Sequence, residues 1–117
     1  MILPGGAYQV YLAPRPVDFR KGHAGSALVV QTVLGRDPYS GAIFVFRSKR
    51  GDRIKILVWD QTGLVLVYKH LEGGQFQWPR PADGVIRLTP AQFTALFEGL
   101  DWRAVRPERR RQPKRAG

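Results

Sequence analysis

Short apolar runs recur along the chain, which is typical of strands and not of long helices. They predict strands over 8–12, 42–47, 54–59 and 64–71, with further short strands over 75–78 and 85–88. Turn residues alone separate the middle three strands, and 60–63 is a tight connection, so these strands are expected to form an antiparallel meander. Within 42–47 apolar side chains occupy both faces, with Phe44 and Phe46 opposite Ile43 and Val45. This pattern predicts a central strand that is covered on both sides.

A first helix is predicted over 19–33. Asp18 is a suitable N-cap for it, and Gly35 follows its last apolar position. Gly22 and Gly25 weaken the helix, since each costs about 1 kcal/mol relative to Ala. The residues expected to share its buried face are Phe19, Ala27, Val30 and Leu34.

A second helix is predicted to begin after Thr89. Thr89 is a good N-cap, Pro90 suits the first helical position, and Gln92 can complete a capping box. Gly99 is the expected C-terminal stop. Its apolar face would carry Phe93, Leu96, Phe97 and Leu100.

These elements predict an α+β fold with a small antiparallel meander sheet of about four to six strands and two main helices. The 117 residues suffice for one domain with one core, which we assign to 1–102. After Trp102 apolar residues nearly vanish and Arg, Pro and Gln dominate. We therefore expect 103–117 to be a flexible, basic tail.

The charge of the chain points to a polyanionic partner. Nineteen Lys and Arg residues against nine Asp and Glu leave a net charge of +10, and +6 of it falls within 103–117. Nucleic acid gains most from such a distribution, because neutralised phosphates release their counterions. RNA and acidic lipid can also bind basic tails. Alternatively, the tail binds nothing and only keeps the protein soluble. The tail residues expected to bind are Arg106, Arg109, Arg110, Arg111, Lys114 and Arg115.

Two further cationic groups lie within the folded part. The first surrounds the turn between the strands 42–47 and 54–59, where a basic hairpin tip can contact a nucleic-acid groove. The second lies at the start of the first helix, where free backbone N–H groups also favour an anion. Polar turns and exposed cations also occur without binding function. The candidates are Arg47, Lys49, Arg50, Arg53 and Lys55 in the hairpin, and Arg20 and Lys21 at the helix start.

Most aromatic residues fall at strand positions and are assigned to packing. Trp78, between Gln77 and Pro79 near a loop, is the best candidate for stacking on an unpaired base.

Several function classes find little support. The chain has no cysteine, its N-terminus lacks the features of a signal peptide, and its longest apolar stretch, 64–68, is too short for a membrane span. His23 and His70 are isolated, and no metal-ligand spacing, phosphate loop or catalytic triad is visible. We expect a cytoplasmic protein, with nucleoid association open, that has no catalytic residue, no metal and no cofactor.

A series of short motifs links the chain to a known family. They are VYLA (10–13), DFRKG (18–22), LGRDPYSG (34–41), IFVFR (43–47), KRGDRIK (49–55), VWD (58–60), Gly63, YK (68–69), LE (71–72), GQF (74–76), WP (78–79), LTPAQ (88–92) and GLDW (99–102). In this order they resemble the accessory proteins called TnpB, or Orf2-like, of the bacterial insertion-sequence family numbered sixty-six. An RNA-guided nuclease shares the name but is a different protein.

The resemblance implies a protein needed for efficient transposition beside a DDE-type transposase and a second small accessory protein, and it implies no catalytic activity. Three positions depart from the family pattern. His23 stands where an aromatic residue is typical, and Val58 stands where a second Trp is frequent. His70 replaces the usual Arg after Lys69, which removes a cation, so His70 is not a candidate for binding.

We therefore predict a DNA-binding accessory factor in transposition with weak sequence specificity, because no recognition helix stands out. RNA remains open as the ligand, and the oligomeric state is undetermined. One alternative is a protein-interaction module that docks on the transposase without touching DNA. Another is a metal-dependent nuclease, which requires converging carboxylates. A single positive face that unites Arg20, Arg47 and Arg53 would favour DNA binding, whereas scattered cations would favour the interaction module.

Overall fold

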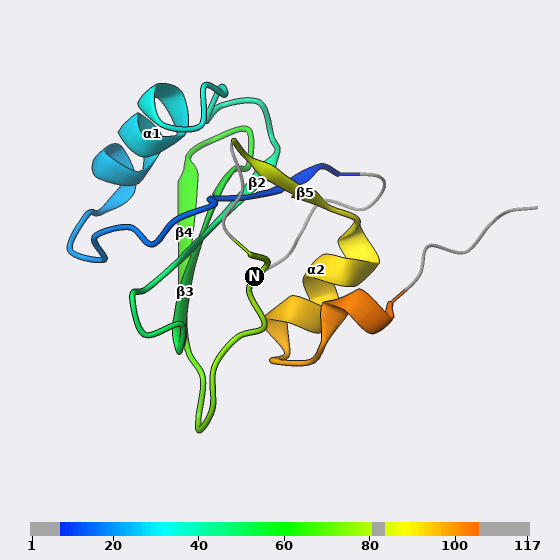
Figure 1. Cartoon of the computed structure of the whole chain (residues 1–117). Coiled ribbons are helices and arrows are strands. Elements are labelled where there is room, and N and C mark those ends of the chain that lie inside the picture. The colour runs from blue at the N-terminus through cyan, green and yellow to red at the C-terminus, as the bar shows by residue number, and fades with distance from the viewer. Residues whose placement is uncertain (1–7, 81–83, 106–117) are drawn as a thin grey trace, which may run out of the picture.

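A five-stranded sheet forms the centre of the protein in the computed structural model, which describes residues 8–80 and 84–105 (Figure 1). The strand order across the sheet is β4-β3-β2-β1-β5. The elements in chain order are β1 (Val10–Leu12), α1 (His23–Thr32), β2 (Ile43–Arg47), β3 (Arg53–Trp59), β4 (Leu64–His70), β5 (Ile86–Leu88), α2 (Pro90–Phe97) and the 3₁₀ helix η1 (Trp102–Ala104).

The predicted α+β class and the meander are confirmed. β2, β3 and β4 pair antiparallel in sequence order, and β5 pairs antiparallel with β1. The pairing of β1 with β2 is parallel, with Val10 opposite Ile43. A parallel pair requires a crossover connection, and α1 lies within it. The sheet is therefore mixed, a feature that the sequence pattern did not predict.

Each face of the sheet is covered by one helix, as Figure 1 shows. On β2, Ile43 and Val45 belong to the core on the α2 side, whereas Phe44 and Phe46 belong to the core on the α1 side. All four side chains are at most 1% exposed. This confirms that β2 is a central strand covered on both sides. Below, these two sides are called the α1 face and the α2 face.

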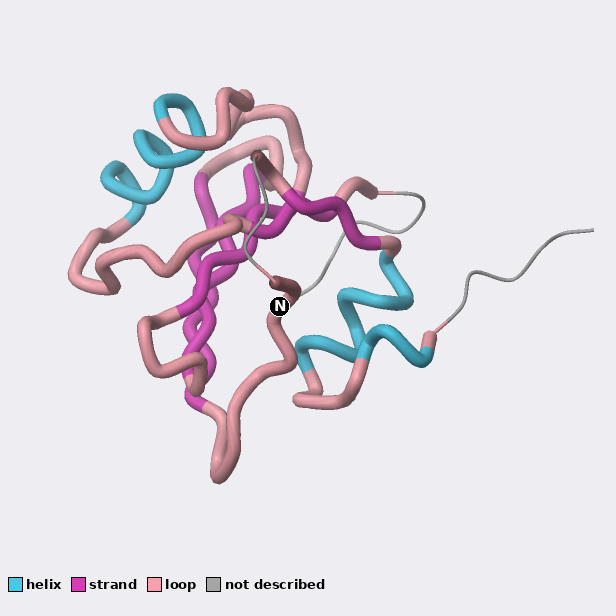
Figure 2. Tube along the Cα trace, viewed as in Figure 1, coloured by secondary structure: helices cyan, strands magenta, loops and turns pink. Residues whose placement is uncertain are grey.

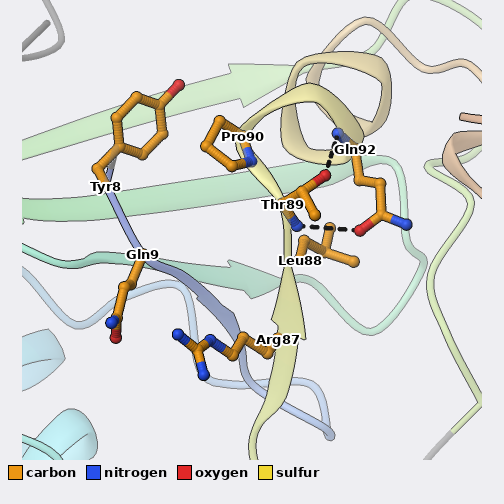
Figure 3. Close-up of a pocket in the computed structure, with 7 residues that line it drawn as sticks. All are labelled: Tyr8, Gln9, Arg87, Leu88, Thr89, Pro90 and Gln92. Atoms are coloured by element: carbon orange, nitrogen blue, oxygen red, sulfur yellow. Dashed lines mark hydrogen bonds between the residues drawn. The ribbon is translucent and has the colours of Figure 1, made fainter. Parts of the chain in front are cut away.

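The predicted boundaries of α2 are confirmed at both ends. The Thr89 hydroxyl accepts from the backbone N–H of Gln92, and the Gln92 side chain accepts from the Thr89 N–H, which is a complete capping box (Figure 3). Gly99 has a φ of +78°, and its N–H donates to the Leu96 carbonyl. The N–H of Leu100 donates to the Ala95 carbonyl, so α2 ends in a Schellman motif.

The predicted start of the first helix is wrong by four residues. α1 begins at His23 after Gly22, which provides no side-chain cap. Asp18 instead accepts from the backbone N–H of Arg20 in a local turn. The side chain of Lys55 donates to the carbonyls of Phe19 and Lys21, which holds this segment outside the helix. A partner from a distant strand thus outweighs the local N-cap signal.

The predicted strand over 75–78 is also wrong. Figure 2 shows this segment as part of the long loop that follows β4. Its Phe76 N–H donates to the carbonyl of Gly51 at 2.7 Å, in the turn between β2 and β3. One backbone hydrogen bond to a turn does not form the repeated pairing of a β-sheet, so the segment is a loop that is hydrogen-bonded to the hairpin and not a strand.

The basic tail falls largely outside the described residues. Of its seven cations only Arg103 is described, in η1, where its guanidinium pairs with Asp101 at 2.9 Å. The predicted binding residues from Arg106 onward lie outside the described part of the chain. Over 8–80 and 84–105, no helix has the length and apolar character that crossing a membrane requires.

Candidate functional site

A cationic groove of about 450 Å³ lies between the β2–β3 turn and the loop that follows β4. We call it the Arg47 groove. Its lining residues are Arg47, Lys49, Arg50 and Gly51 from the hairpin, and Gln75, Phe76, Gln77, Trp78, Pro79 and Arg80 from the loop. Four of these lining residues are cations, and none of the described residues that line the groove is an Asp or Glu. An anion is the ligand that this lining favours.

Hydrogen bonds fix the loop wall of the groove against the rest of the fold. The Gln75 side chain donates to the Arg50 carbonyl at 2.6 Å. The Trp78 indole N–H donates to the Ala13 carbonyl at 3.1 Å, and the Trp102 indole donates to the Gln77 carbonyl at 2.6 Å. Together with the bond from Phe76 to Gly51, these contacts join the loop to the hairpin, to the segment after β1 and to η1. The groove is therefore pre-organised, which reduces the entropic cost of binding.

Arg47 is the groove residue whose surroundings most favour a further hydrogen-bond partner. It ends β2 on the α2 face, and its guanidinium lies 6.0 Å from the centroid of the Trp78 ring. Its Nε is buried and has no hydrogen-bond partner among the described residues. Burial lowers the pKa of Arg47 from its ordinary value, but an arginine remains charged in proteins. A buried donor without a partner is costly, and an anionic ligand would satisfy this one only after the side chain shifts to expose it.

The other strand cations of the hairpin lie on the opposite face. Arg47 pairs with Ile54, so Arg53 and Lys55 alternate onto the α1 face. Arg53 is exposed and donates to the Tyr68 hydroxyl at 3.1 Å. The structure thus does not bring Arg53 together with Arg47.

Lys55 is a buried structural residue. Its side chain is only 8% exposed, and its ammonium donates to the carbonyls of Phe19 and Lys21. The same ammonium lies 5.1 Å from the ring centroid of Phe19 and 5.7 Å from that of Tyr68. With these partners and so little exposure, Lys55 is not placed to reach a ligand in solution.

The cations at the start of the first helix do not line the groove. Arg20 pairs with Asp18 at 2.8 Å, and this bond holds the pKa of Asp18 at about 2. The pair is solvent-exposed and neutralises the charge of Arg20. Lys21 is exposed and lies on the α1 side, where its carbonyl accepts from Lys55. The three residues Arg20, Arg47 and Arg53 therefore do not form a single positive face, and by this criterion alone the scattered cations favour the interaction module.

The acidic residue of the hairpin tip has partners of its own. Asp52 contacts His70 at 3.2 Å and accepts from the Ser48 hydroxyl at 3.4 Å. Burial raises the pKa of Asp52, but hydrogen bonds from its own backbone and from His70 outweigh this effect, and the net shift is downward. Asp52 is not among the described residues that line the groove.

Trp78, the predicted stacking candidate, and Arg80, which was not predicted, both line the groove. Trp78 is partly exposed in the groove, whereas Phe44, Phe46 and Phe76 are buried in the core. Arg80 follows Trp78 by two positions, and this proximity of a cation to the indole was the available signal.

A second hollow, of about 380 Å³, lies between the start of β1 and the start of α2. Figure 3 shows its lining, in which Arg87 extends from β5 toward Gln9. Among the described residues that line it Arg87 is the one cation, so this hollow is the weaker anion site. Nowhere in 8–80 and 84–105 do three or more His, Asp or Glu side chains gather as a metal site would require.

The mixed sheet with one helix on each face and a pinned cationic groove defines a small, basic α+β domain. Residues 8–107 match the family model described as IS66 Orf2 like protein, so the chain belongs to that family. Two relatives from Sinorhizobium fredii (strain NBRC 101917 / NGR234) are both called uncharacterized proteins. The protein y4jC is 42% identical over 113 residues, which is 97% of each chain. The protein y4hO is 38% identical over 117 residues, which is 99% of this chain and all of the relative. No solved structure matches the chain.

Proposed function

We propose that this protein assists transposition by binding DNA through phosphate contacts in the Arg47 groove. The family supports the coarser statement of an accessory role in insertion-sequence transposition. The observation that supports the finer one is a groove whose described lining contains Arg47, Lys49, Arg50 and Arg80 and no carboxylate. Phosphate satisfies guanidinium donors with short, charge-assisted hydrogen bonds.

Whether a cation already has an ion-pair partner decides whether we assign it to the DNA contact. The four groove cations have no ion-pair partner among the described residues, whereas Arg20 pairs with Asp18 and Arg103 pairs with Asp101. A paired cation must lose its partner before it neutralises a phosphate, so it releases less free energy. We therefore assign Arg47, Lys49, Arg50 and Arg80 to the DNA contact. Arg20, Lys21, Arg53 and Lys55 are not assigned to it.

The basic tail adds affinity without sequence preference in this proposal. Its six cations beyond Arg103 are Arg106, Arg109, Arg110, Arg111, Lys114 and Arg115. They follow the folded domain directly, so they can track the phosphates of DNA held at the groove. Such contacts fix position but read no bases, in keeping with weak specificity. The partners would be DNA, the element's transposase and its second accessory protein, and no step requires a cofactor.

A salt titration of DNA binding tests this proposal. Fluorescence anisotropy would follow a labelled 30-base-pair duplex with the full chain, with Arg47→Gln, and with a variant that ends at Val105 and keeps all described residues. We expect the affinity to fall steeply with salt for the full chain, with a slope shallower by about 1 for Arg47→Gln and by up to about 5 for the shortened chain.

The matched control is Arg36→Gln. Arg36 is an exposed cation on the α1 face, 4.6 Å from the Tyr11 ring centroid, so its removal changes the net charge equally. We expect a clearly smaller effect on binding than for Arg47→Gln. Equal effects, or no binding by the full chain at low salt, would contradict the proposal.

A different observation favours the second candidate, a docking module for the transposase. β4 is a seven-residue edge strand with partly exposed Leu64, Val65, Leu66 and Val67, and within the described part of the chain no strand pairs with its outer side. Such an edge can accept a strand from a partner. Capture of the element's transposase that survives nuclease treatment, and is lost in Val67→Lys, would support this role. Capture that nuclease abolishes would count against it.

A further inference from the structure

We infer that the Arg47 groove holds one unpaired nucleotide, with its base against Trp78 and its phosphate among the surrounding cations. This inference rests on the proposed DNA binding and specifies which form of DNA the groove takes. It predicts that the protein prefers DNA that is single-stranded or locally melted to an intact duplex.

The size and shape of the groove support this ligand. Its volume of about 450 Å³ lies at the lower end of the range for small-ligand pockets and leaves room for a single nucleotide. A duplex keeps its bases stacked inside and presents only its phosphates to a hollow of this size. A concave site with an indole in its wall offers more contact area to an unpaired base than to a backbone.

The groove is lined by an aromatic residue that can contact the base and by cations that can contact the phosphate. Trp78 packs partly against the core and contributes the rest of its aromatic surface to the groove, and base stacking on such a surface tolerates every base. The guanidinium of Arg47 lies 6.0 Å from the centroid of the same ring. Its Nε is buried, so a phosphate oxygen would reach the terminal nitrogens first and the Nε only after a shift of the side chain. Lys49, Arg50 and Arg80 line the same groove, so backbone charge on either side of the nucleotide is neutralised.

The loop wall is held in place before any ligand arrives. The Trp78 indole N–H is already bonded to the Ala13 carbonyl, and its neighbour Gln77 is bonded to Trp102. The indole therefore has a fixed orientation, and its N–H already has a hydrogen-bond partner before a ligand binds. A fixed stacking surface next to unpaired arginine donors is the juxtaposition from which we infer an unpaired nucleotide.

The experiment compares a 15-nucleotide oligo-dT with a 15-base-pair duplex at the same salt concentration. The full chain is measured against Trp78→Leu, Trp78→Phe and Arg47→Gln by fluorescence anisotropy, with circular dichroism as the check on folding. We expect oligo-dT to bind more tightly than the duplex. Trp78→Leu should weaken oligo-dT binding about tenfold and leave duplex binding nearly unchanged, and Trp78→Phe should restore most of the loss.

Tryptophan fluorescence provides a second measurement that does not depend on the folding of Trp78→Leu. Oligo-dT should quench the emission of the full chain, and the quenching should be largely absent in Trp78→Phe. Trp59→Phe is the matched control, since Trp59 packs against Tyr39 at the end of β3 and does not line the groove. Its quenching by oligo-dT should persist. Tripolyphosphate, which carries charge without a base, should not quench.

The outcomes separate this inference from the proposed function. Equal affinity for the two DNAs, with no effect of Trp78, would overturn the inference. If Arg47→Gln still weakened both DNAs, DNA binding itself would stand. Binding of tripolyphosphate that displaces oligo-dT without any quenching by oligo-dT would identify a simple anion site and also overturn the inference. No binding of either DNA at low salt would overturn both.

Discussion

Lys55 and Arg47 are cations on neighbouring strands of one hairpin, yet their surroundings differ. Lys55 is 8% exposed, and its ammonium has two backbone carbonyls and two aromatic rings around it. Arg47 is half-buried beside one aromatic ring, and its Nε has no partner in the described part of the chain. The strands place the first on the α1 face and the second on the α2 face.

The difference teaches that burial of a cation does not by itself identify a binding site. A buried charge with complete hydrogen bonding is part of the fold, because its donors have nothing left to offer a ligand. A half-buried guanidinium with an unused donor carries a desolvation cost that only a further partner can offset. Unused hydrogen-bonding capacity is therefore the property that distinguishes Arg47 from Lys55.

The largest expected effect is on stability at Lys55. Lys55→Ala removes two hydrogen bonds from a charged donor and leaves a gap between Phe19 and Tyr68, so the free energy of unfolding should fall by about 3 kcal/mol. Lys55→Met keeps the aliphatic stem and should lose less. Urea unfolding followed by circular dichroism measures both. Wild-type stability with weakened DNA binding would reverse the roles that we assign to Lys55 and Arg47.

The next effect is on binding at Arg47. Arg47→Gln should weaken duplex binding about five- to tenfold at low salt, which corresponds to roughly 1 kcal/mol for one lost phosphate contact. Its free energy of unfolding should change little, because the buried Nε that is removed has no partner to lose. Anisotropy and urea unfolding of the same preparation give the two values. A large loss of stability would show that Arg47 is, like Lys55, a structural cation.

A smaller change tests whether binding simply follows stability. Thr89→Ala removes the N-cap of α2, the helix on the opposite face of the sheet from α1. The change should cost about 1 kcal/mol of unfolding free energy. DNA affinity should stay at the wild-type value, since Thr89 does not line the Arg47 groove. If this variant lost affinity as Arg47→Gln does, the loss in Arg47→Gln could not be assigned to a phosphate contact.

The smallest effect concerns the exposed pair of Arg20 and Asp18. Arg20→Gln should lower the unfolding midpoint only slightly and leave DNA affinity unchanged, because exposed ion pairs contribute little. The pKa of Asp18 should rise from about 2 toward its ordinary value, since the bond from Arg20 is the main cause of the low value. The lowered pKa stabilises the fold above the ordinary carboxyl pKa, and this contribution disappears as the pH falls through about 2. A carboxyl NMR titration measures the shift, and an unchanged pKa would contradict the assignment.

Local chemistry was sufficient to predict much of the fold. The capping box at Thr89 and the stop at Gly99 involve residues that are close in sequence, and both are confirmed. The meander follows from alternating runs joined by short turns. The start of α1 was predicted wrongly because Lys55, a residue far along the chain, takes the carbonyls of Phe19 and Lys21. The segment 75–78 was also predicted wrongly because its partner is distant in sequence. Its backbone bonds to the turn at Gly51 and not to a neighbouring strand.

The candidate site was predictable only in part. The sequence places Arg47, Arg53 and Lys55 in one hairpin, but the register of the two strands decides which of them share a face. With Arg47 opposite Ile54, the other two fall on the other side of the sheet. Arg80 joins the groove only because the loop after β4 folds back on the hairpin, and no local pattern specifies that return.

An NMR titration of the full chain with DNA tests the central claim most directly, because the side-chain Nε–H of arginine and the indole N–H of tryptophan give separate signals. We predict that the Arg47 Nε–H and Trp78 Nε1–H signals shift as DNA is added, together with the amides of residues 49–51. Signals of Phe19, Tyr68 and the α1 face should move little. Shifts confined to the α1 face or to β4, with Arg47 and Trp78 unmoved, would contradict the account.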